Sequence, residues 1–290
     1  MKTKMRIILV LICLVTLSLS KNVFSTDKNQ IDSWLQQLNN SNWQVRSGAS
    51  RSLFYCLSDS NDEKLIEKIK TTLIEQLIKE IDWNENGQLK DETRAGESGD
   101  YLFDLAEYVA SFKDTRAIPS LVRFGPFGSV REALLEFGEP AAIEILNRLE
   151  IKFPALGSLG KKGYIEILGE MTKPKNNGYV AEGKIRNEIK QALIKILETT
   201  IYPEDKNIKW YYEIAEQQSL PRKAAINALG NLGDTDIIPI IKSIAEKDSF
   251  SYMKDASIMG GKKGEKITIY PVREAAKKVL EELKARQKQE

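Results

Sequence analysis

Two segments of this chain occur twice, and this internal repetition limits the possible folds more than any other feature. Residues 114–121 (DTRAIPSL) return as residues 234–241 (DTDIIPII), with the aspartate, the threonine and the proline in the same places. Residues 130–133 (VREA) return in the same way as residues 272–275. A repeated unit of this size cannot bury its apolar face alone, so the copies are expected to stack on one another.

Apolar residues recur at helical spacing along the remainder of the chain. The range 65–81 carries leucine or isoleucine at spacings of one, three and four, with charged residues on the opposite face. Similar stripes cover 185–197 and 272–283, while alternating strand patterns are nearly absent. About twelve helices are predicted, joined mostly by short turns. Glycine supplies the left-handed cap that ends a helix, and four glycines are predicted to do so: Gly138, Gly169, Gly230 and Gly233.

The order of these motifs resembles a known repeat family. A first helix with Asp-x-x-Ala-Ile-Pro-x-Leu, a second with Val-Arg-x-Ala and an ending Leu-Gly are similar to HEAT repeats, in particular the short bilin-lyase type within the armadillo-like class. The resemblance is good over 100–172 and 205–285 and weaker over 30–84. It implies an all-α fold, a right-handed α-solenoid of about six HEAT-like helix pairs that occupies residues 26–290. It indicates architecture rather than activity.

The repeated motifs also give structural roles to charged residues. An aspartate before the first helix of a pair can accept hydrogen bonds from free backbone N–H groups. The resemblance implies that arginines near the start of the second helix reach aspartates between repeats, in a ladder that fixes the register. The alternative for these arginines is a ligand-binding role. The predicted ladder consists of Arg46, Asp114, Arg131, Arg222, Asp234 and Arg273.

The composition argues against most enzyme chemistry. The chain has no histidine, which removes the commonest general base and the usual transition-metal ligand. Its two cysteines, Cys13 and Cys56, cannot form a disulfide framework or a cysteine zinc site. We therefore predict no catalytic residue, no cofactor and no metal site.

Residues 1–25 have the pattern of a secretory signal peptide. Three positive charges precede an apolar run from Ile7 to Leu19, which is short for a membrane-spanning helix. Small residues allow cleavage after Ser20 or after Ser25, with a slight preference for the second. A lipoprotein acylated at Cys13 is the alternative, although this cysteine lies inside the apolar run. We expect an exported protein, periplasmic or extracellular, without a stable membrane span after cleavage.

Cleavage after Ser25 would remove four basic residues and no acidic one, so 39 basic residues would stand against 41 acidic ones. Without a basic footprint, nucleic acid is not an expected partner. Cys56 would be the remaining cysteine. Its apolar neighbours predict a buried and inert thiol.

Two long segments interrupt the repeats. Residues 84–100 are polar and contain glycine, and they are predicted to form an inserted loop, either functional or merely solvated. Residues 249–270 lie between the two helices of the last repeat. Their second half alternates polar and apolar residues after a glycine-rich stretch, which predicts a small β-hairpin.

Aromatic and basic residues near this hairpin suggest a contact surface. Three consecutive aromatic residues, 210–212, cannot all face the core of one helix. Insertions in repeat proteins often lie on the binding face. The alternative is that the hairpin only covers the apolar end of the last helix pair. The residues predicted to contact a partner are Trp210, Tyr211, Tyr212, Tyr252, Lys262 and Lys263.

Two functions from different classes follow. The first is an exported, non-catalytic scaffold that binds a protein or peptide partner, which the sequence does not identify. The second is an enzyme like the bilin lyases or the deoxyhypusine hydroxylase among HEAT-like proteins. The hydroxylase family binds iron through histidine and glutamate, so the absence of histidine speaks against that activity.

Overall fold

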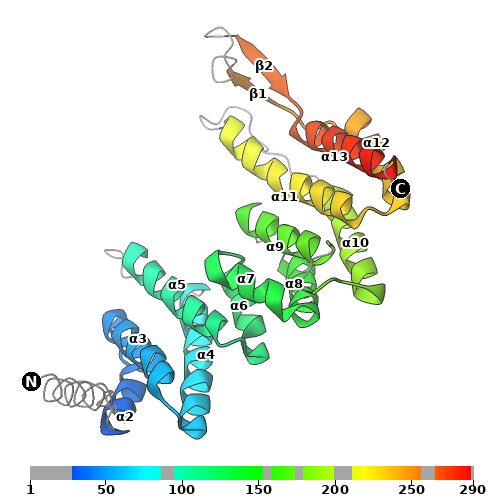
Figure 1. Ribbon diagram of the computed structural model, residues 1–290. Coiled ribbons are helices and arrows are strands. Elements are labelled where there is room, and N and C mark those ends of the chain that lie inside the picture. Colours follow the sequence, from blue (N-terminus) through cyan, green and yellow to red (C-terminus); the bar gives the residue numbers. More distant parts are fainter. Residues whose placement is uncertain are drawn as a thin grey trace, which may run out of the picture. The chain divides into compact units, whose positions relative to one another are not determined.

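The fold is α-helical with one small hairpin, as the sequence predicts. The computed structural model describes residues 28–85, 95–152, 158–173, 179–198, 211–255 and 265–288. Within these ranges the chain forms twelve α-helices and a two-stranded antiparallel sheet, shown in Figure 1. The predicted signal peptide, residues 1–25, lies outside the described residues.

The helices belong to two compact units, Met1–Phe112 and Lys113–Glu290. In the first unit α2 packs on α3 and α4 packs on α5, and the second helices α3 and α5 also contact each other. Leucine and isoleucine side chains of α4 are buried on one face, as its stripe predicts. The four helices of this unit are α2 (Lys28–Gln37), α3 (Trp43–Asp59), α4 (Glu63–Glu85) and α5 (Ala95–Ser111).

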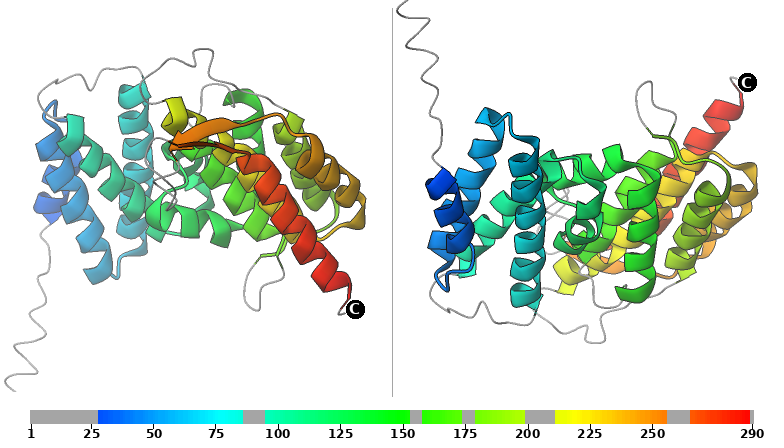
Figure 2. Two further views of the ribbon diagram at one scale, coloured as in Figure 1. Left: turned by 90° about the horizontal axis from the view of Figure 1, so that it is seen from above. Right: turned by 90° about the horizontal axis from the view of Figure 1, so that it is seen from below.

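The second unit contains four further helix pairs in two layers, seen from two sides in Figure 2. The first helices of its pairs are α6 (Ile118–Phe124), α8 (Glu139–Lys152), α10 (Gly183–Glu198) and α12 (Ile238–Lys247). The second helices are α7 (Gly128–Phe137), α9 (Ser158–Met171), α11 (Tyr211–Leu232) and α13 (Pro271–Gln287).

In this unit each second helix packs on the next, from α7 through α9 and α11 to α13, while α8 packs on α6 and α10. Two pairs in one unit and four in the other agree with the predicted number of about six. That all of them form one stack over 26–290 stays a prediction.

Two of the four glycines assigned to helix ends have a different role. Gly138 and Gly233 follow α7 and α11 with φ values of 67° and 73°, so they do end helices. Gly169 and Gly230 lie inside α9 and α11, and the prediction is wrong for them. A Cβ atom on Gly169 would lie 2.6 Å from the Cβ of Ala228, and one on Gly230 would lie 2.7 Å from a methyl group of Val279. These glycines permit close packing of neighbouring second helices.

The insertion predicted for 84–100 is helical at both ends. Helix α4 continues through Glu85 and α5 begins at Ala95, so 86–94 alone lie outside the described residues. Among the side chains of α5 that the structure describes, the first buried one is that of Tyr101. An existing helix extends towards its N-terminus at little cost, because each added residue completes a backbone hydrogen bond. The sequence did not predict that α5 begins at Ala95, because residues 96–100 are polar or glycine and carry no apolar stripe.

The hairpin predicted for 249–270 is present between α12 and α13. Strands β1 (Tyr252–Asp255) and β2 (Lys266–Ile269) pair antiparallel, with Tyr252 opposite Ile269. Residues 256–264 lie outside the described part of the chain. Strand β1 packs against α11.

Candidate functional site

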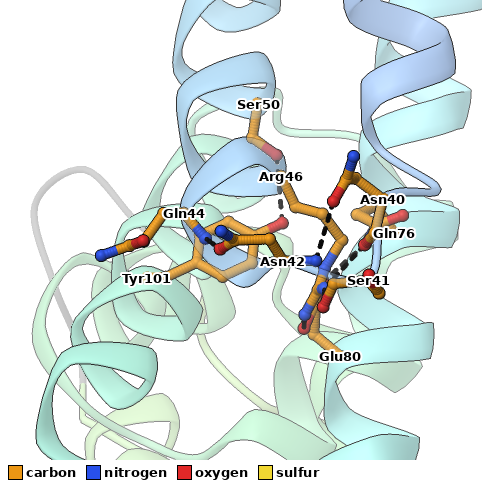
Figure 3. A network of polar contacts seen from close by, with 9 residues as sticks. All are labelled: Asn40, Ser41, Asn42, Gln44, Arg46, Ser50, Gln76, Glu80 and Tyr101. Carbon is orange, nitrogen blue, oxygen red and sulfur yellow. Dashed lines mark hydrogen bonds and ion pairs between the residues drawn. The ribbon is translucent and has the colours of Figure 1, made fainter. Parts of the chain in front are cut away.

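Arg46 is the centre of a buried polar network in the first unit, shown in Figure 3. It lies one turn into α3, and its side chain is 3% exposed. Its Nε and Nη2 atoms donate to the two carboxylate oxygens of Glu80 on α4, at 2.6 and 3.0 Å. This fork-shaped pairing is the strongest geometry available to an arginine and a carboxylate. It joins the two helix pairs of the unit.

The same network fixes the turn before α3. Arg46 Nη1 donates to the carbonyl oxygens of Asn40 and Ser41, at 2.9 and 3.0 Å. The guanidinium group also lies 4.7 Å from the ring centre of Trp83. Arg46 therefore contacts the turn before α3, the carboxylate of Glu80 and the ring of Trp83.

The remaining members of the network are satisfied by their neighbours. Gln76 donates to Glu80 at 2.6 Å from one turn earlier on α4. Ser50 of α3 and Tyr101 of α5 share a hydrogen bond of 3.2 Å. Burial, and then the nearby Glu80 carboxylate, raise the pKa of Tyr101, so its hydroxyl stays protonated. The network locks helices together and offers no reactive group.

Arg131 makes the corresponding contact in the second unit. Its Nη2 atom lies 2.6 Å from an oxygen of Glu170, which joins α7 to α9 in the layer of second helices. It also pairs with its neighbour Glu132. Arg131 thus forms an ion pair between the second helices of two neighbouring pairs, with a glutamate as the partner.

Asp114 and Asp234 hold equivalent places in the repeated motif but act differently. Asp114 caps the short 3₁₀ turn before α6, where it accepts from the backbone N–H of Arg116 at 3.0 Å. Asp234 makes no side-chain cap and instead accepts from Arg186 and Lys190 of α10, at 2.7 and 3.1 Å. Hydrogen bonds from Arg186 and Lys190 lower the pKa of Asp234.

Arg222 and Arg273 converge on one residue that the sequence reasoning missed. The side chain of Arg222 on α11 pairs with the carboxylate of Asp248, and Arg273 on α13 donates to the backbone oxygen of Asp248. Asp248 ends α12 and also accepts from the backbone N–H of Phe250 at 3.0 Å. It joins three helices and the start of the hairpin. The signal that could have found it is an acid placed directly after the last apolar turn of α12.

Tyr252, predicted to contact a partner, is buried instead. Phe250 and Tyr252 are 3% and 5% exposed. Burial, and then the carboxylates of Glu216 and Glu274, raise the pKa of Tyr252 to about 12. Lys254 anchors the same strand to Glu216 of α11 at 3.4 Å. The structure gives this face of the hairpin a packing role.

The other predicted contact residues cannot be placed. Trp210, Lys262 and Lys263 lie outside the described residues. Tyr211 and Tyr212 begin α11, but their side chains also lie outside the described part. Their contribution to a binding surface stays a prediction.

A groove of about 510 Å³ lies between α8 and α10. These two helices run side by side in the layer of first helices of the second unit (Figure 1). Sequence reasoning did not single it out, because its residues are ordinary members of amphipathic helices. The groove is lined by Leu146, Asn147, Leu149, Glu150, Asn187, Glu188, Gln191, Ala192, Lys195 and Ile196.

The described residues hold neither a candidate metal site nor a candidate membrane-spanning helix. No three acidic or cysteine side chains there come together as metal ligands would. Among the same residues, no helix combines the length and apolar character that crossing a bilayer requires.

Comparison with known proteins supports a HEAT-repeat architecture. The model of one protein family, PBS lyase HEAT-like repeat, matches residues 221–247. This range contains the second half of α11 and all of α12, with Arg222 and Asp234. Comparison with curated proteins and with solved structures gives no match. The fold is that of a helical repeat protein, and the match supports a HEAT-like repeat at residues 221–247.

Proposed function

We propose that this chain is an exported, non-catalytic HEAT-repeat scaffold that binds a protein or peptide partner. One observation carries the proposal: in the second unit, each second helix packs on the next, which gives a continuous layer from α7 to α13. Repeat proteins use such layers as extended recognition surfaces, because each repeat contacts only its neighbours.

The charged residues of the repeated motifs support the same proposal. Arg131 and Arg222 pair with carboxylates of neighbouring segments, and Asp234 pairs with α10. These groups serve the packing of the helix pairs and do not converge on one cavity as catalytic groups would. The outer faces of the helices are the surface that remains for a partner.

Export rests on the sequence of residues 1–25, which combines a basic start with a short apolar run. It implies that binding takes place in the periplasm or outside the cell. An intact mass that begins near Lys21 or Thr26, measured on protein from the native host, would support this part of the proposal. Retention of Met1 in a cytoplasmic fraction would contradict it.

The binding role is tested by affinity capture from an envelope fraction, with residues 26–290 as bait. We expect one polypeptide to be retained in a fixed ratio to the bait and to be displaced by an excess of untagged chain. Retention that the untagged chain cannot displace would count against a specific partner. Stoichiometric iron or zinc in the purified protein would contradict the non-catalytic part.

A further inference from the structure

We draw no further inference here: the strongest candidate, a cavity of about 620 Å³ that the ends of α9, α11 and α13 line together with the start of α10, carries nothing because its arginines, Arg186 and Arg286, already pair with Asp234 and with backbone oxygens of α11, and nothing in the structure shows what would occupy it.

Discussion

The buried pair of Arg46 and Glu80 allows a direct test of how the first unit is held together. The change Glu80→Leu removes the acceptor of two hydrogen bonds at 2.6 and 3.0 Å and leaves a guanidinium group whose side chain is 3% exposed. Breaking a buried ion pair from one side destabilises a protein by about 3–5 kcal/mol, because the remaining charge is buried without a partner. We expect the free energy of unfolding to fall by this amount.

The reciprocal change, Arg46→Leu, should lower the free energy of unfolding by a similar amount. It leaves the Glu80 carboxylate with the Gln76 amide and frees two backbone oxygens in the turn before α3. The double change Arg46→Leu with Glu80→Leu leaves no buried charge. It should cost much less than the sum of the single changes, within about 2 kcal/mol of the unchanged chain.

Urea unfolding followed by tryptophan fluorescence measures these values. Three of the four tryptophans, Trp34, Trp43 and Trp83, belong to the first unit, so the signal reports mainly on that unit. Single changes that cost less than about 1 kcal/mol would refute the reasoning. A double variant as unstable as the sum of the single ones would refute it equally.

Three further predictions concern the second unit. Gly169→Ala should destabilise it by about 1–3 kcal/mol through the contact with Ala228. Gly160→Ala on the same helix, which meets no atom within 4 Å, should be neutral or stabilising, and urea unfolding followed by far-UV circular dichroism measures both changes. Asp234→Asn should cost about 1–2 kcal/mol at neutral pH. The pKa of Asp234 is lowered in the folded chain, so the stability that its ion pairs contribute is complete above about pH 4 and is lost as the pH falls through the folded pKa. The free energies of unfolding of the unchanged chain and of the variant Asp234→Asn should therefore converge in acid. A difference that stays constant with pH would contradict the pairing. Replacing residues 249–270 by a short Gly/Ser loop exposes the surface that Phe250 and Tyr252 cover. Calorimetry should then show a melting temperature lower by about 10 °C. An unchanged melting temperature would mean that the hairpin does not stabilise the helices on which it packs.

The sequence predicted the helices because their apolar stripes are long and regular, and it predicted the hairpin from alternation on one side of a glycine-rich turn. It could not distinguish a glycine that ends a helix from one that lets two helices approach. Gly138 and Gly169 both follow an apolar residue, but the second role depends on Ala228, which lies far away in the sequence.

The repeated motifs indicated the arginines of the predicted ladder but not the residues with which they pair. Arg46 and Arg131 reach glutamates on a later helix, and Arg222 reaches an aspartate at the end of α12. Neither glutamate belongs to a repeated motif, so sequence spacing gave no reason to choose it. The groove between α8 and α10 was missed for a similar reason, since it depends on how far apart two helices pack.

Native mass spectrometry of the chain purified from the envelope of its native host tests the central claim most directly. The account predicts a mass equal to the chain without its first 20 to 25 residues plus one further polypeptide, and no bound metal. A chain that retains Met1 and carries no second polypeptide, or one that carries a stoichiometric metal ion, would contradict it.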